Sequence, residues 1–347
     1  MQSGFNTYWP VYQRLEHEVL KLANVILFND EQINIYSPYI GELIVRCAIE
    51  IETLSKDLYN KICRENSMKI KNRPYFDKDC IGLLIDKWKI DKKKIQITNI
   101  NMFFSKGKSV LTPLKNAHEK QEKGSEWKQA YQGIKHNRSQ EIKVATINNL
   151  LNALGALYIL NIYYKNDSYW DNVPINDRKP YANDSAIFSP MIYDASKSIF
   201  QEQETVEQIE ESIYIKKLLD ENMQKIRAAL FEANHRTTLE VCLSKNNIKN
   251  HILGKNIHQD MYSIANECGI DISREFVKNV RFDKSTANFF METEIVLNHG
   301  TPIYQCQSYE EFLASDKARE ISKEYEVNAT KSANDVLADI QNKSDVL

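Results

Sequence analysis

The sequence predicts a mainly α-helical protein, with an N-terminal helical bundle and a C-terminal, mostly helical domain that includes one small β-hairpin. Glycine and proline are scarce, at 10 and 8 of 347 residues, whereas strand-rich folds need many glycine turns. Apolar residues recur at spacings of three and four over several long segments, which indicates amphipathic helices. No repeat of solenoid length is present.

The first two helices are expected over residues 12–29 and 38–63. In the second, Pro38 fits the first helical turn and apolar residues follow at helical spacing: Ile40, Leu43, Ile44, Cys47, Ile51, Leu54 and Leu58. A short helix is expected over 79–88. The basic run 91–94 is interpreted as a solvated turn, and 101–114 fits no single pattern.

A third long helix is expected to start after Gly124 and Ser125, since serine is a common N-cap. It leads into the segment 142–164, which carries the widest apolar face of the chain. We therefore expect 142–164 to be the most buried helix of the bundle.

The domain boundary is placed where the helical period is lost. Residues 1–165 form the bundle, 166–200 a linker or ordered loop with three prolines, and 201–347 the C-terminal domain. In the last part, helices are expected over 202–234, with near-heptad spacing that could form a dimer seam, and over 238–267. Residues 293–304 predict a strand, a turn and a second strand.

Composition excludes several function classes. Lys plus Arg number 45 and Asp plus Glu 47, so no global basic field would draw the chain to nucleic acid or a membrane. The six cysteines form no C-x-x-C unit, which favours a reduced, cytoplasmic setting. We expect no signal peptide, no membrane span and no membrane partner.

Sequence motifs for nucleotide phosphates, nucleophilic serine and catalytic zinc are absent. Seven histidines are scattered, and His251 and His258 share a helical spacing without a further ligand to complete a site. We expect no metal and no cofactor.

The most informative stretch runs from Trp127 to Arg138 and ends in Lys135, His136, Asn137 and Arg138. An arginine fork can neutralise two phosphate oxygens and an imidazole can transfer a proton, so His136 and Arg138 suit a phosphodiester. They would converge only if the helix kinks or restarts near Ser139. Otherwise they cap the helix, since cations are favourable near its C-terminus.

Two further groups are candidates for support of that site. Glu42, Arg46 and Glu50 are spaced by four and share one helix face, where they either form an ion-pair ladder or assist binding. Tyr131 and Trp127 are also four apart. They either anchor the core or offer a surface for stacking bases.

These segments resemble the HEPN superfamily of helical bundles, in a bacterial, defence-related form. The matching parts are Tyr39 to Glu52, Trp127 to Arg138, and the apolar helix to Tyr164. In the family an arginine, followed four to six residues later by a histidine, forms a metal-independent ribonuclease site, usually across a dimer. Here His136 precedes Arg138 with one residue between them.

The resemblance implies a homodimeric endoribonuclease of an antiviral defence or toxin system. His136 and Arg138 would be catalytic, and Lys135, Asn137, Tyr131, Glu42, Arg46 and Glu50 would bind RNA or support the site. The alternative is a non-enzymatic dimeric scaffold, or a nucleotide- or RNA-binding module, whose C-terminal domain recognises a protein partner. A structural component of a phage or mobile element is a third interpretation.

Overall fold

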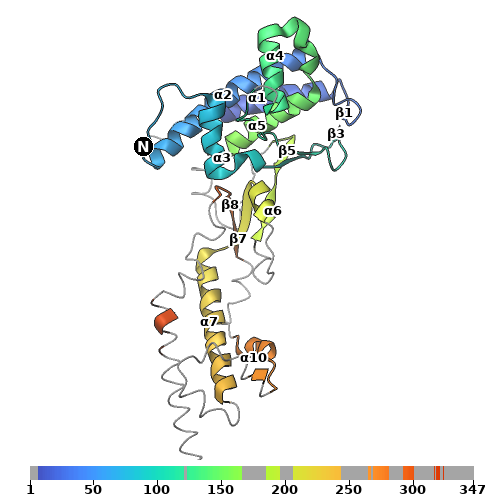
Figure 1. Cartoon of the computed structure of the whole chain (residues 1–347). Coiled ribbons are helices and arrows are strands. Elements are labelled where there is room, and N and C mark those ends of the chain that lie inside the picture. Colours follow the sequence, from blue (N-terminus) through green and yellow to red (C-terminus); the bar gives the residue numbers. More distant parts are fainter. Residues whose placement is uncertain are drawn as a thin grey trace, which may run out of the picture. The chain divides into compact units, whose positions relative to one another are not determined.

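The computed structural model describes residues 7–120, 123–165, 185–195, 206–243, 265–266, 269–280, 292–300, 316, 318–320 and 323. The protein is mainly α-helical, as predicted (Figure 1). It divides into two compact units, 1–217 with 294–303, and 218–293 with 304–347. The expected division into folding domains at residues 165 and 200 stays a prediction.

The first unit is built on four helices: α1 (Tyr8–Ala23), α2 (Pro38–Glu65), α4 (Glu126–Glu141) and α5 (Ile147–Lys165) (Figure 1). Helix α2 starts as expected. Pro38 occupies its first turn, and the Ser37 hydroxyl accepts a hydrogen bond from the Ile40 amide at 3.1 Å. The predicted helix 142–164 begins later, at Ile147, because residues Ile142–Val144 form a separate 3-10 turn. Helix α5 is buried on nearly every side, as expected for the central helix of the bundle.

Helix α1 differs from its predicted range of 12–29. It begins earlier, at Tyr8, and ends at Ala23, after which residues 28–29 form the short strand β1 (Phe28–Asn29). The predicted short helix is present as a π-helical turn, Phe76–Ile81, that continues into α3 (Gly82–Trp88).

Short strands fill the gaps between the helices of the first unit. β1 pairs in parallel with β3 (Met102–Phe103). β2 (Ile95–Ile97) pairs antiparallel with both β4 (Val110–Leu111) and β5 (Phe188–Pro190). The pattern that was unclear over 101–114 therefore holds two strands and the turns between them.

The predicted long helix over 202–234 is wrong. Its residues form α6 (Val206–Glu211), strand β7 (Tyr214–Leu218) and the first part of α7 (Asp220–Leu243). β7 lies between β6 (Ile192–Asp194) and β8 (Thr293–Leu297), and its residues are largely buried. The apolar positions Ile209, Ile213 and Leu219 also fit a helical spacing, so local periodicity does not distinguish this strand from a helix.

β8 confirms the first strand predicted in 293–304, while the second predicted strand, at 301–304, lies outside the described residues. Asn298, directly after β8, joins several elements. Its side-chain amide donates to the backbone carbonyls of Ile209 (2.6 Å) and Ser212 (3.0 Å). Its backbone carbonyl accepts a hydrogen bond from the Tyr163 hydroxyl at 2.7 Å.

The basic run 91–94 is not a solvated turn. Lys93 is wholly buried, and its ammonium donates to the carbonyl of Glu210 at 2.9 Å. Lys92 and Lys94 form ion pairs with Glu210 and Glu211. Three consecutive lysines therefore hold the end of α6, because its carboxylates and a terminal carbonyl lie against them.

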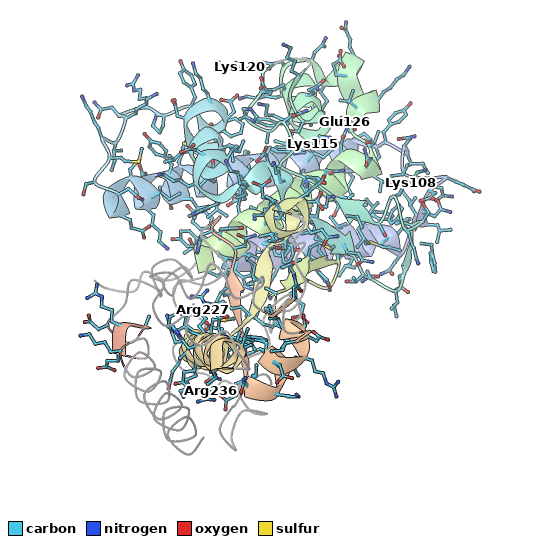
Figure 2. All side chains as sticks on the ribbon, turned by 60° about the horizontal axis from the view of Figure 1, so that its bottom comes forward. Lys108, Lys115, Lys120, Glu126, Arg227 and Arg236 are labelled. Carbon is cyan, nitrogen blue, oxygen red and sulfur yellow. The ribbon has the colours of Figure 1, made fainter. Side chains whose placement is uncertain are left out.

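In the second unit α7 packs against α10 (Ile272–Asn279). Arg236 on α7, labelled in Figure 2, donates to the carbonyl of Asn279 at 3.3 Å and pairs with Glu232 at 3.0 Å. The helix predicted over 238–267 is seen only in part, since α7 continues to Leu243 and 244–264 lie outside the described residues.

Candidate functional site

Helix α4 is sharply kinked at Asn137, whose backbone angles (φ −147°, ψ 56°) leave the helical region. A Cβ placed on Gly133 would lie 3.2 Å from the Cβ of Glu141. Residues eight apart in a straight helix are separated by about 12 Å, so the chain folds back after Asn137. Gly133 makes this possible because it has no side chain. A kink, which is the condition for His136 and Arg138 to converge, is therefore present two residues before Ser139.

The four polar residues at the kink are all exposed. Asn137 donates to the side chain of Gln140 at 2.6 Å, and the Lys135 ammonium lies 5.3 Å from the centre of the Tyr131 ring. Within the described part of the chain, His136 and Arg138 make no hydrogen bond and no ion pair. Neither side chain caps a helix by donating to its carbonyls, so both are available to a ligand.

Tyr131 and Trp127 belong to the hydrophobic core and not to a surface for bases. Their exposed fractions are 4% and 1%, and the Trp127 indole donates to the carbonyl of Pro113 at 2.8 Å. Of the two interpretations of this pair, the core anchor is the one that the structure shows. Tyr131 can support the site only by fixing the position of α4.

The stripe on α2 does not form an ion-pair ladder. Glu42 is exposed, Arg46 and Glu50 are half-buried, and the described residues include no ion pair among the three. Burial raises the pKa of Glu50, and the charge of Arg46 opposes that shift. Among the described residues, the Arg46 guanidinium therefore has no hydrogen-bond or ion-pair partner.

The start of α2 contacts α4 just before the kink. A Cβ on Gly41 would lie 3.3 Å from Ala145 and 3.6 Å from Ile134, so the two helices approach closely there. This contact connects the stripe that begins at Glu42 with the end of α4 that carries His136. No direct bond between the stripe and the kink is present among the described residues.

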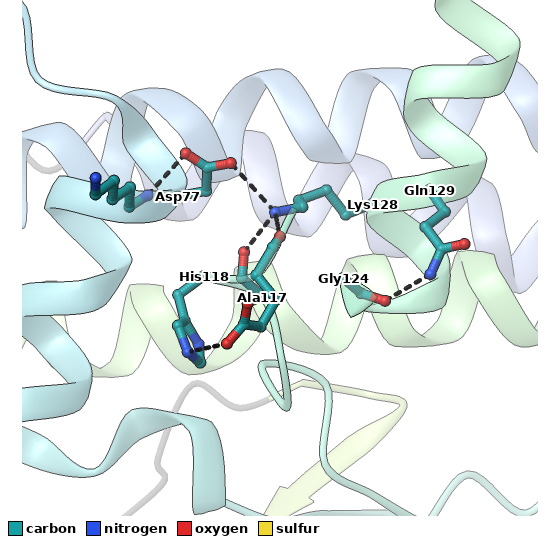
Figure 3. A network of polar contacts seen from close by, with 8 residues as sticks. Asp77, Ala117, His118, Gly124, Lys128 and Gln129 are labelled. Carbon is teal, nitrogen blue, oxygen red and sulfur yellow. Dashed lines mark hydrogen bonds and ion pairs between the residues drawn. The ribbon is translucent and has the colours of Figure 1, made fainter. Parts of the chain in front are cut away.

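Lys128 fixes the other half of α4 (Figure 3). Its ammonium is buried and donates to the carbonyls of Ala117 (2.9 Å) and Glu119, and it pairs with Asp77 at 3.3 Å. Burial lowers the pKa of Lys128, while Asp77 opposes that shift. All donors are used within the protein, so this lysine is a structural anchor. Lys128 follows Trp127 directly in the sequence and lies on the buried side of α4. This position is the signal from which its burial could have been predicted.

The described residues hold no group of three His, Cys, Asp or Glu side chains that could bind a metal ion. His251 and His258 lie outside them. In the same part of the chain, none of the helices combines the length and apolar character needed to cross a bilayer.

Comparison with protein-family models, with curated proteins and with solved structures found no match for this chain.

Proposed function

We propose that this protein is a HEPN-type bacterial endoribonuclease of a defence or toxin system, which binds and cuts RNA at the kink of α4. The observation that carries the proposal is the state of His136 and Arg138. Both side chains are exposed on either side of a break in a helix, and neither has a partner among the described residues. Two unpaired groups of this chemistry are suited to an external phosphodiester.

The proposed roles follow from the two side chains. Arg138 donates two parallel N–H bonds to the phosphate oxygens and neutralises their charge. His136 removes the proton of the ribose 2′-hydroxyl, whose oxygen attacks phosphorus while the bond to the 5′ oxygen breaks. The products are a 2′,3′-cyclic phosphate and a 5′-hydroxyl.

The leaving 5′ oxygen needs a proton, and one imidazole cannot be acid and base in the same step. We therefore propose a homodimer in which the second copy's His136 supplies that proton. Two-fold dimers are the commonest oligomers, and the resemblance to HEPN proteins implies the same arrangement. Light scattering should give twice the monomer mass, and a monomer at micromolar concentration would contradict this step.

The test compares the wild type with Arg138→Lys, Arg138→Ala and His136→Asn on a labelled single-stranded RNA. Lysine keeps the charge but not the fork, so both arginine variants should lose cleavage. His136→Asn should bind RNA without cutting it. Lys108→Gln, on an exposed turn outside the kink, is the control and should cut normally.

Melting temperatures separate this function from a structural role. Both side chains are exposed, so all variants should melt close to the wild type. Full activity of Arg138→Lys, or unfolding of the variants, would refute the proposal. RNA binding by the wild type without cleavage would instead identify a non-enzymatic binding module. Growth arrest on expression that is lost with His136→Ala would support the toxin role.

A further inference from the structure

A cavity of about 760 Å³ lies at the N-terminal end of α4. It is bounded by segments 112–119 and 123–129 and by Asn152 of α5. Its volume is within the range of small-molecule sites. Ser125 and His136 are eleven residues apart, or roughly 16 Å along a helix, so the cavity is separate from the kink.

Most of the cavity lining is polar or charged, and its two lysines have no partner within the part of the chain that the structure describes. Lys115 and Lys123 are exposed, and neither makes a hydrogen bond or an ion pair with another described residue. Figure 2 labels Lys115 together with Glu126, which also lines the cavity. Two ammonium groups without partners favour an anionic ligand.

The two carboxylates of the lining are already engaged. Glu126 accepts a hydrogen bond from the Asn148 amide at 3.2 Å, and Oε1 of Glu119 lies 3.1 Å from Nε2 of His118. The charge count of the lining is balanced, but the groups that remain available are the cations. The two carboxylates keep their charge, but the two ammonium groups have no ion-pair partner among the described residues.

The backbone adds further unused donors. Ser125 is the N-cap of α4, yet its hydroxyl makes no cap hydrogen bond, and its Oγ atom is buried without a partner among the described residues. The carbonyl of Ser125 accepts the amides of Lys128 and Gln129. In the described part of the chain, the amides of Glu126 and Trp127 have no acceptor, and the first amides of a helix are where anions are stabilised.

We propose that this cavity binds a small phosphorylated molecule, whose phosphate contacts the ammonium groups of Lys115 and Lys123. Three observations support this proposal: the lysines without partners among the described residues, the carboxylates that already have contacts, and the cavity volume. The free amides of the first α4 turn complete the set of donors. The site does not depend on RNA cleavage at the kink.

Isothermal titration calorimetry of the full chain with inorganic pyrophosphate tests the proposal. The wild type should bind with a dissociation constant at or below about 1 mM, and Lys115→Gln and Lys123→Gln should each weaken binding about tenfold. Glu126→Gln should strengthen binding, because it removes a negative charge from the lining. Lys108→Gln, on an exposed turn outside the cavity, should bind like the wild type.

Arg138→Ala separates this site from the proposed nuclease, since it should keep full affinity for pyrophosphate. If Arg138→Ala abolished binding while the two cavity variants kept it, the anion would occupy the kink and this inference would be wrong. Absence of saturable binding, or equal affinity in every variant, would also overturn it.

Discussion

The ammonium of Lys93 donates a hydrogen bond to the backbone carbonyl of Glu210 across 2.9 Å, although Lys93 is wholly buried. No carboxylate forms an ion pair with it within the described residues; the nearby charges are those of Glu210, Asp91 and Lys92. A buried ammonium with one neutral acceptor is poorly compensated for lost hydration. Burial accordingly lowers the pKa of Lys93 to about 7, from 10.5 for an exposed lysine.

This pKa makes stability depend on pH. Between pH 7 and 10.5 the unfolded chain binds a proton at Lys93 that the folded chain does not, so the free energy of unfolding should rise with pH across this window. Below pH 7 both states are protonated and the full cost of burial is present. From pH 7 to 9 we expect a gain of roughly 2 kcal/mol from this group.

Lys93→Met isolates that contribution. Methionine has similar length without charge, so the variant should be more stable than the wild type at pH 7 and should lose the rise with pH. Urea unfolding at pH 7, 8 and 9 measures both effects. Parallel pH profiles for the two proteins would show that Lys93 keeps an ordinary pKa.

Two serines at helix starts should respond differently to the same substitution. The Ser37 hydroxyl caps α2 through the Ile40 amide, so Ser37→Ala should lower the free energy of unfolding by about 1 kcal/mol. Ser125 makes no such bond at α4, so Ser125→Ala should cost less than about 0.5 kcal/mol. Denaturant titration of both variants checks this, and an equal loss would contradict the assigned cap geometry.

Gly300 is held in a conformation that other residues rarely adopt. Its φ is +73°, and a Cβ there would lie 2.9 Å from the backbone oxygen of Lys87. Gly300→Ala should therefore destabilise the protein by more than about 1 kcal/mol. Gly107→Ala is the matched control, since a Cβ on Gly107 meets nothing within 4 Å. A neutral Gly300→Ala would mean that residues near 300 do not pack on α3.

Cleavage by the proposed nuclease should need no divalent ion. Arginine cannot ligate a metal, and the 2′-hydroxyl is the nucleophile, so activity should survive excess chelator. Mass spectrometry of the products should show a 2′,3′-cyclic phosphate. Activity that appears only with magnesium or manganese, or a product with a 3′-hydroxyl, would assign the cutting to another site or to a contaminant.

The sequence was most informative where one period dominates. The helical spacing from Ile40 to Leu58 and the Pro38 start predict α2 almost to the residue. The segment that contains β7 failed because its burial comes from pairing with β6 and β8, which are distant in sequence. A local pattern cannot reveal such pairing, and the spacing of Ile209, Ile213 and Leu219 fits a helix equally well.

In the candidate site, too, local geometry could be predicted from the sequence, whereas contacts between distant segments could not. The kink between His136 and Arg138 was stated as a condition from helix geometry, and the close approach of Gly133 and Glu141 fulfils it. The burial of Lys93 and Lys128 was missed, because lysine is rarely buried and their acceptors are backbone carbonyls of other segments. Residue types alone do not encode those acceptors.

The pairing of β7 with β8 also has a consequence for biosynthesis. β7 ends at Leu218 and β8 begins at Thr293, so residues 219–292 leave the ribosome before β8 does. The four-helix core, whose helices end at Lys165, can assemble while the chain is still being translated. During that interval one edge of β7 is unpaired, and an unpaired strand edge is a site for association with other chains. That edge of β7 is therefore covered only late in synthesis, when β8 has been translated and can pair with it.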